Sequence, residues 1–296
     1  MRKTDSYGIN EKGHFTLGGA DTVLLAEKYG TPLYVMDEDL IRENMRLYQE
    51  SIDRYYGGRG LCCYASKAFS CKRIYEVCKD EGIGADVVSM GELYTAIQAG
   101  FDPSKICYHG NNKTRDELEY ALSCKVGRIV SDSLLELDML DELAGAAGEK
   151  AGVLLRLCPG IDAHTHAFIR TGSIDSKFGF AISLGDAMEA VKYALSKKNI
   201  RLLGIHCHIG SQIFEVEPFT HAAEVMVSFL AEIKRETGQI LPELNLGGGF
   251  GIRYTEEDDP LPFGKYMEVV SGALKKACQK LDMPLPYVID VYKRQE

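Results

Sequence analysis

The sequence predicts an α/β fold, a (β/α)8 barrel of the TIM type preceded by a separate N-terminal segment. Eight short β-like runs alternate with helical patterns over roughly 230 residues, which is the count and length of such a barrel. The early units repeat evenly, since Val88, His109 and Val130 lie 21 positions apart. Helix-start signals follow several of the runs. The second choice is a doubly wound open sheet.

Each unit can be placed on the chain. The eight runs are residues 61–69, 83–88, 106–109, 128–131, 152–157, 202–208, 243–246 and 287–290. Three capping boxes precede apolar residues at helical spacing, and they are Ser89-x-x-Glu92, Thr114-x-x-Glu117 and Ser133-x-x-Glu136. These boxes predict helices that start directly after strands two, three and four.

The two ends of the chain do not fit the repeat. Residues 32–36 read as a strand, and Asp37 can cap the helix that follows. The apolar positions of that helix step by four and three: Ile41, Met45, Tyr48, Ile52 and Tyr55. At the other end strand eight reaches Asp290, and residues 291–296 read as a polar tail that we expect to be non-native.

Composition narrows the class of partner. The 296 residues are 45% apolar and 26% charged, enough for one large globular domain. A net charge of −9 argues against nucleic acid and anionic membranes, which require basic patches, so a small molecule is the expected partner. Without a signal peptide or an apolar span, the chain is expected to be soluble and cytoplasmic. Its nine cysteines form no CxxC pair and are expected to be reduced core residues.

Reactive side chains fall where a barrel places its active site, at the C-terminal ends of the strands. They are Lys67 after strand one, Asp86 in strand two, His109 and Asn111 after strand three, Arg156 on strand five, His206 and His208 on strand six, and glycines after strand seven. The rim of a barrel without any function would also carry polar residues, so each of these residues taken alone also has a purely structural explanation.

Lys67 is the most informative of these residues, because it ends an apolar run. Burying an ammonium group is costly, and forming an imine with a carbonyl compound is one use of such a lysine. The alternative is that Lys67 only extends its amine to the rim.

Gly247-Gly248-Gly249 follows strand seven, where barrels commonly hold a phosphate through backbone N–H groups. The dinucleotide pattern G-x-G-x-x-G fails, because Tyr254 stands at its third glycine position. A plain flexible turn is the structural alternative. An imine-forming lysine together with a phosphate nest favours pyridoxal phosphate, which supplies an aldehyde, an aromatic ring and a phosphate.

His206 and His208 stand at i and i+2 on one face of strand six, as in metal-dependent barrel hydrolases. A metal site would recruit His164 and His166, which lie in a long loop away from the strand ends. The other interpretations are a packed histidine without a role and an imidazole stacked on a planar ligand, with Ser211 near its phosphate. We favour the stacked imidazole and expect no metal.

Three motifs resemble those of the pyridoxal-phosphate-dependent decarboxylases with an alanine-racemase-like barrel (fold type III), and most closely the diaminopimelate decarboxylase family. They are Tyr64-Ala65-Ser66-Lys67-Ala68, His206-Cys207-His208-Ile209-Gly210-Ser211-Gln212 and Gly247-Gly248-Gly249. The segments 159–166, 171–172 and 176–179 resemble this family more than its ornithine, arginine or racemase relatives. The resemblance spans nearly the whole chain.

The resemblance implies a cytoplasmic, homodimeric enzyme of lysine biosynthesis that decarboxylates meso-2,6-diaminopimelate to L-lysine and CO₂. It implies Lys67 and His208 as catalytic residues, with Lys67 bonded to the cofactor and His208 stacked on the pyridine ring. Ser211, Gly247, Gly248 and Gly249 would cradle the phosphate, and Asp86 and Arg156 would lie beside the ring. The alternatives are an ornithine, arginine or carboxynorspermidine decarboxylase of the same family, or a metal-dependent hydrolase using His206 and His208.

The chain departs from the family after strand eight. Family members continue into Glu-Pro-Gly-Arg, whereas this chain reads Asp290-Val291-Tyr292-Lys293, so Asp290 is the nearest counterpart of the glutamate at the pyridine nitrogen. Residues 1–36 would be strands of an otherwise missing β-domain, and residues 37–290 would be the cofactor-binding barrel. Because that domain completes the partner subunit's active site, we expect this chain to dimerise weakly, bind the cofactor weakly and decarboxylate poorly or not at all.

Overall fold

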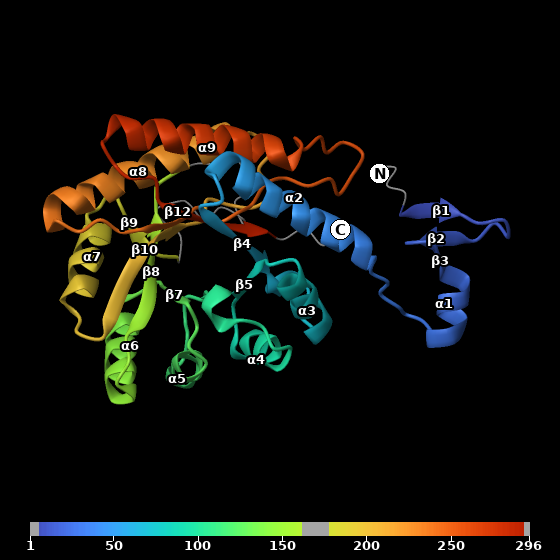
Figure 1. The fold of residues 1–296 in the computed structure, drawn as a ribbon, viewed down its shortest axis with the longest axis horizontal. Helices are drawn as coiled ribbons and strands as arrows, with labels where there is room; N and C mark the ends of the chain where they lie inside the picture. Colours follow the sequence, from blue (N-terminus) through green and yellow to red (C-terminus); the bar gives the residue numbers. More distant parts are fainter. Residues whose placement is uncertain (1–5, 162–177, 293–296) are drawn as a thin grey trace.

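The structure is a computed structural model that describes residues 6–161 and 178–292. Eight parallel strands form a closed barrel, shown in Figure 1. Around the barrel they are β4 (Gly60–Ala65), β5 (Gly84–Val87), β6 (Ile106–Tyr108), β7 (Arg128–Ser131), β8 (Ala151–Cys158), β10 (Ile200–Cys207), β11 (Glu243–Asn245) and β12 (Tyr287–Tyr292). Because β8 pairs with β10 and β12 pairs with β4, the sheet closes on itself. The barrel is confirmed and the open sheet is wrong.

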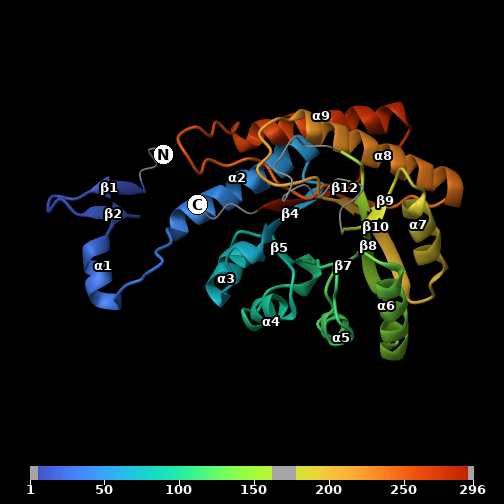
Figure 2. The same cartoon turned by 180° about the vertical axis from the view of Figure 1, so that it is seen from behind.

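Helices surround the barrel, as both views show (Figures 1 and 2). They are α2 (Glu38–Tyr56), α3 (Lys72–Asp80), α4 (Met90–Gln98), α5 (Arg115–Ser123), α6 (Leu134–Ala147), α7 (Asp186–Ser196), α8 (Glu217–Thr237) and α9 (Phe263–Lys280). Two short 3-10 turns, η1 (Ser66–Ala68) and η2 (Pro103–Lys105), and the edge strand β9 (Phe180–Ala181) complete this part. Among the described residues no helix is long and apolar enough to cross a membrane.

The predicted helix starts are confirmed, with one refinement. Thr114 forms a complete capping box with Glu117. Ser89 and Ser133 each accept a hydrogen bond from the backbone N–H three positions on, but the glutamates there have other partners. The Glu92 carboxylate accepts from the Val88 N–H and lies 2.9 Å from Ser66 Oγ. Tertiary neighbours therefore compete with the local cap for these carboxylates.

The barrel interior is filled by small and aliphatic side chains rather than left open. The interior cluster consists of Leu61, Cys63, Cys107, Val130, Leu154 and Ile289. At the N-terminal end of the strands Arg128 of β7 pairs with both carboxylate oxygens of Glu243 of β11, at 2.7 and 2.8 Å. All nine cysteines are free, as predicted.

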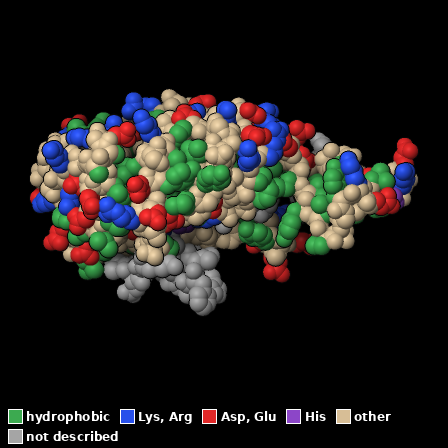
Figure 3. Space-filling view, turned by 90° about the horizontal axis from the view of Figure 1, so that it is seen from below, with side chains coloured by type: hydrophobic (Ala, Val, Ile, Leu, Met, Phe, Trp, Pro, Cys, Tyr) green, Lys and Arg blue, Asp and Glu red, His purple; other side chains and the backbone are tan. Residues whose placement is uncertain are grey.

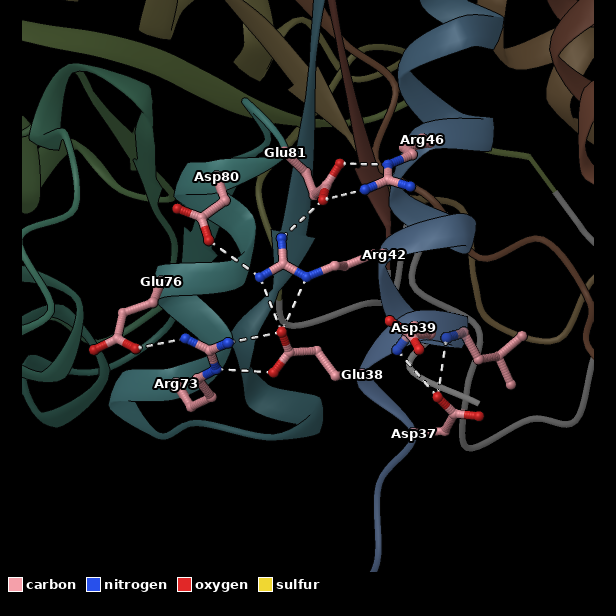
Figure 4. A network of polar contacts seen from close by, with 10 residues as sticks. Asp37, Glu38, Asp39, Arg42, Arg46, Arg73, Glu76, Asp80 and Glu81 are labelled. Carbon is pink, nitrogen blue, oxygen red and sulfur yellow. Dashed lines mark hydrogen bonds and ion pairs between the residues drawn. The ribbon is translucent and has the colours of Figure 1, made fainter. Parts of the chain in front are cut away.

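An ion network joins α2 to α3 at the outside of the barrel, shown in Figure 4. Glu81, which directly follows α3, accepts hydrogen bonds from Arg42 and Arg46 of α2 at 2.7 to 2.9 Å. Glu38 at the start of α2 bonds Arg73 of α3 at 2.7 and 2.8 Å. Charges of both signs are interspersed over the face seen in Figure 3, as the acidic but mixed composition predicts.

The N-terminal segment forms a small unit that stands away from the barrel (Figure 2). Three antiparallel strands, β1 (Tyr7–Ile9), β2 (Phe15–Leu17) and β3 (Ala20–Asp21), lead into α1 (Thr22–Tyr29), of which no residue is buried. The helix α1 was not predicted, and the strand expected at residues 32–36 is wrong. That stretch has no pairing partner, and Tyr34 within it is 97% exposed.

The eighth barrel strand is longer than predicted. β12 continues through Val291 and Tyr292, which pair with Cys63 and Tyr64 of β4. These two positions therefore belong to the barrel sheet. The remaining residues of the predicted tail, 293–296, lie outside the described residues.

Candidate functional site

Lys67 lies where the sequence predicts, in the turn η1 at the C-terminal end of β4. The turn is anchored to β5 and α4, because the buried Ser66 Oγ lies 2.9 Å from both the Asp86 carbonyl oxygen and a Glu92 carboxylate oxygen. The Lys67 side chain itself is exposed. The argument from a buried ammonium is therefore wrong, whereas the position at the strand end is confirmed.

The three glycines after β11 make a bend in which no side chain has room. Gly247 and Gly249 have φ of 73° and 105°. A Cβ on Gly247 would lie 2.8 Å from His208 Nδ1, and one on Gly249 would overlap the carbonyl oxygen of Gly210. A Cβ on Gly248 would overlap the Val291 carbonyl oxygen. The bend is therefore a close approach of backbones that requires glycine at all three positions.

His208 and Ser211 belong to the loop after β10, and that loop is bonded to the glycine bend. The Ile213 N–H donates to the Gly249 carbonyl at 3.0 Å, and the Gly251 N–H donates to the Ile213 carbonyl at 2.8 Å. The Gly248 N–H faces His208 Nδ1 at 3.5 Å. The structure thus brings together the predicted stacking residue and the predicted phosphate cradle.

The glycine bend and Lys67 open on the same end of the barrel. β11, β12 and β4 are neighbours in the sheet and run in parallel, so their C-terminal ends share one rim. The Val291 N–H of β12 donates to the Gly247 carbonyl at 2.7 Å, and Val291 is paired with Cys63 of β4. Two strand spacings of about 4.8 Å therefore separate the bend from the strand that ends in Lys67.

Asp86, His109, His206 and Arg156 form a buried polar group at this rim. Asp86 Oδ2 of β5 lies 3.6 Å from His109 Nε2, and the His109 and His206 rings meet edge to face at 4.7 Å. Arg156 is paired with His206 in the sheet, and its guanidinium covers the Phe178 ring at 4.0 Å. Asn111 is exposed on the loop and is not part of this group.

Burial dominates the electrostatics of this group. It raises the pKa of Asp86 to about 7, although the Lys67 ammonium lowers it. It lowers the pKa of His109 well below the usual value, and the Arg156 cation adds to the effect. Burial likewise lowers the pKa of His206. Both imidazoles are therefore neutral at pH 7.

Sequence reasoning missed a second buried charge group beside Arg156. Lys113 Nζ lies 2.8 Å from Glu136 Oε1 and donates to the carbonyls of Gly110 and Val130. Asp132 Oδ1 lies 3.8 Å from Arg156 Nε. The signal was available, because Lys113 and Asp132 follow strand ends and directly precede helix caps, but their partners are distant in sequence.

Asp290 does not lie where the sequence comparison placed it. Its neighbour Ile289 points into the barrel interior, so Asp290 points to the opposite side of the strand, toward Tyr56 of α2. Asp290 is 3% exposed, and burial raises its pKa to about 8. It therefore faces the helix layer and is no counterpart of the glutamate at the pyridine nitrogen.

The metal alternative gains no support from the described part of the chain. No group of three or more histidine, cysteine, aspartate or glutamate side chains there could hold a metal ion. His206 contacts His109, whereas His208 lies against the glycine bend, so the two do not converge on one point. His164 and His166 lie outside the described residues.

Comparisons with known proteins agree with this arrangement. Residues 38–288 match the family described as "Pyridoxal-dependent decarboxylase, pyridoxal binding domain". The chain is 48% identical over 280 residues to a diaminopimelate decarboxylase of Bacillus methanolicus, covering 95% of this chain and 65% of that protein. It is 45% identical to one of Bacillus subtilis, covering 94% of this chain and 63% of that protein. The chain thus spans slightly less than two thirds of these relatives.

Solved structures show the same fold. A diaminopimelate decarboxylase of M. jannaschii in complex with L-lysine superposes with a TM-score of 0.89 at 35% identity, covering 100% of this chain and 68% of that one. Since the family match includes most of the barrel, from α2 to β12, the chain belongs to the pyridoxal-dependent decarboxylases and carries their pyridoxal-binding domain.

Proposed function

We propose that the barrel mouth binds pyridoxal phosphate, with Lys67 as the residue that bonds its aldehyde. The observation that supports this most is that the strand ending in Lys67 and the glycine bend lie at the same rim of the barrel, with His208 against the bend. Gly247, Gly248, Gly249 and Ser211 cradle the phosphate in this proposal, and Asp86 and Arg156 lie beside the ring.

The residues present fit the cofactor. The bend leaves no room for a Cβ. The Gly247 N–H donates to Asn245 Oδ1 and the Gly248 N–H faces His208 Nδ1, so the Gly249 N–H is the donor of the bend that remains for a phosphate. The buried Asp86 Oδ1 has no hydrogen-bond partner in the structure, so the rim has a polar atom to offer a ligand. The Lys67 amine is exposed and thus accessible to an aldehyde.

When bound, pyridoxal phosphate supplies an aldehyde for amines and a ring that accepts the electron pair left by a departing carboxylate. The chain's own residues orient and shield it. Lys67 Nζ would be the amine that holds the cofactor, the glycine bend and the Ser211 hydroxyl would hold its phosphate, and the His208 imidazole would cover one face of its ring. The Arg156 cation and the Asp86 carboxyl group set the local charge.

We further propose that the substrate is meso-2,6-diaminopimelate and the products are L-lysine and CO₂. Relatives at 45 to 48% identity bear the name diaminopimelate decarboxylase, and the M. jannaschii structure bears L-lysine in its title. The homodimer and the cytoplasmic location remain predictions, to be tested by analytical ultracentrifugation and cell fractionation. The division into residues 1–36 and a barrel at 37–290 is proposed on the family match at 38–288 and the unburied helix α1.

The cofactor proposal is tested by adding pyridoxal phosphate to the chain, reducing with borohydride and mapping the adduct by mass spectrometry. We expect modification at Lys67 and none at that position in Lys67→Ala, with the exposed Lys72→Ala as the matched control. Adducts spread over surface lysines without preference for Lys67 would refute the site.

The substrate proposal needs a separate assay. Release of ¹³CO₂ from labelled meso-diaminopimelate is compared with release from ornithine, arginine and carboxynorspermidine at equal concentration. Preference for any of the last three would refute the proposed substrate while leaving the cofactor site intact.

A further inference from the structure

Three buried residues at the barrel mouth each have a polar atom without a hydrogen-bond partner. The atoms are Asp86 Oδ1, His109 Nε2 and His206 Nδ1, on side chains from residues that are 5%, 6% and 2% exposed. The proposed cofactor site uses Asp86 but assigns nothing to His109 or His206. Buried polar groups without partners are rare, so these two imidazoles call for an explanation.

The geometry holds the His109 ring toward Asp86. The His109 backbone N–H donates to the Val87 carbonyl at 2.8 Å, which fixes the residue at the end of β6. The His206 ring packs edge to face against it at 4.7 Å and 69°. His109 Nε2 then lies 3.6 Å from Asp86 Oδ2, so an approach of about half an ångström gives an ordinary hydrogen bond.

The surrounding charges keep His109 neutral. The groups that act on the Asp86 and His109 pair come from the neighbouring elements: Lys67 after β4, Glu92 on α4, Lys113 after β6, Arg156 on β8, and His206 and His208 on and after β10. Three of them are cations that oppose a second proton on His109. A neutral imidazole has one N–H to donate, and the nearest carboxylate oxygen is that of Asp86.

We propose that His109 is a positioning residue that donates its Nε2–H to Asp86 and holds that carboxyl group as an anion beside Lys67, while His206 fixes the plane of the ring. A hydrogen bond to the ionised form opposes the effect of burial on Asp86. The inference rests on the proposed function, because it gives the Asp86 anion its place beside the bound cofactor.

The tautomer can be measured on the unmodified chain without cofactor. In ¹⁵N-histidine NMR, His109 should carry its proton on Nε2 from pH 6 to 9, and its signal should move in one step as Asp86 titrates. That step should vanish in Asp86→Asn. A proton on Nδ1, or a step that persists in Asp86→Asn, overturns the inference.

Two variants of His109 separate donation from packing. His109→Phe keeps a ring without a donor, and His109→Gln keeps an N–H donor. Without its donor Asp86 keeps the raised pKa of about 7, so most of it is neutral at pH 6.5 and almost all of it is ionised at pH 9. His109→Phe should therefore weaken cofactor binding about fourfold at pH 6.5 and less than about twofold at pH 9. His109→Gln should stay near the parent chain at both pH values.

Two controls test whether the loss of binding is specific to the His109–Asp86 pair. The exposed His221→Phe on α8 should change neither value, and adding His109→Phe to Asp86→Asn should cause no further loss. An equal loss at both pH values, or an equal loss in the Phe and Gln variants, assigns His109 a packing role and overturns the inference. If the parent chain forms no Lys67 adduct, the proposed function fails, and the NMR result still decides the His109 tautomer.

Discussion

Asp290 offers the sharpest test of the electrostatic reasoning, because it is a buried carboxyl group without a counter-ion. It is 3% exposed, and its Oδ1 has no hydrogen-bond partner in the structure. Tyr56 on α2, which interacts electrostatically with Asp290, likewise has an unpartnered hydroxyl. Replacing Asp290 with asparagine keeps the shape and removes the ionisation.

The magnitude follows from the shift in pKa. Burial raises the pKa of Asp290 from 3.8 to about 8, so the folded chain keeps a proton that the unfolded chain loses. The contribution to stability is fully present below pH 4 and is lost as the pH rises through 8. At about 1.4 kcal/mol per pH unit, raising the pH from 5 to 7 lowers the free energy of unfolding by about 2.7 kcal/mol through this group.

Urea unfolding at pH 5 and pH 7 measures this difference. Asp290→Asn should lose about 2 to 3 kcal/mol less than the parent chain between the two pH values. The control is Asp259→Asn, whose side chain is 98% exposed and which should follow the parent. Asp86 and Glu136 also have raised pKa values, but both are present in every variant. Their contributions to the change of unfolding free energy with pH therefore cancel in the comparison. An unchanged slope in Asp290→Asn would contradict the assignment of a buried, unpaired carboxyl group.

Three further perturbations test other parts of the fold and site. Gly249→Ala should weaken cofactor retention at least about tenfold by equilibrium dialysis, because its Cβ overlaps a neighbouring carbonyl, whereas Gly272→Ala, with open space around it, should retain the parent value. Glu81→Gln should lower the free energy of unfolding by about 1 to 2 kcal/mol, since it removes the carboxylate that two arginines share. A change below a few tenths of a kcal/mol would show that solvent screens this contact. Arg128→Met should destabilise the chain by about 2 kcal/mol, because it leaves the largely buried Glu243 carboxylate unpaired. The double variant with Glu243→Leu should recover most of that loss, and no recovery would refute the pairing argument.

Local patterns were sufficient to predict the barrel and the placement of Lys67, His208 and the glycine bend at its C-terminal rim. The alternation of strand and helix, the even spacing and the caps at Ser89, Thr114 and Ser133 are properties of short segments, and each was found in the structure. Lys67, His208 and the glycine bend were expected at one rim because parallel strands end on the same side. That expectation needs only the strand order and no side-chain detail.

Other features depend on contacts between distant segments, which a local pattern does not contain. The exposure of Lys67 depends on how the turn η1 sits on β5 and α4. The pairing of Lys113 with Glu136 joins a loop to a helix one unit further along the chain. The approach of His109 to Asp86 and His206 requires the barrel to close, because the three residues come from β5, β10 and the end of β6.

By itself the sequence determined which elements form, in what order, and which reactive residues stand at the strand ends, because hydrophobic periodicity and capping act within a few residues. Only the tertiary structure decided that Asp290 points to the helices and that His109 faces Asp86. The physical reason is that burial, and with it the charge state of each buried group, is set by neighbours that the chain brings together from far apart.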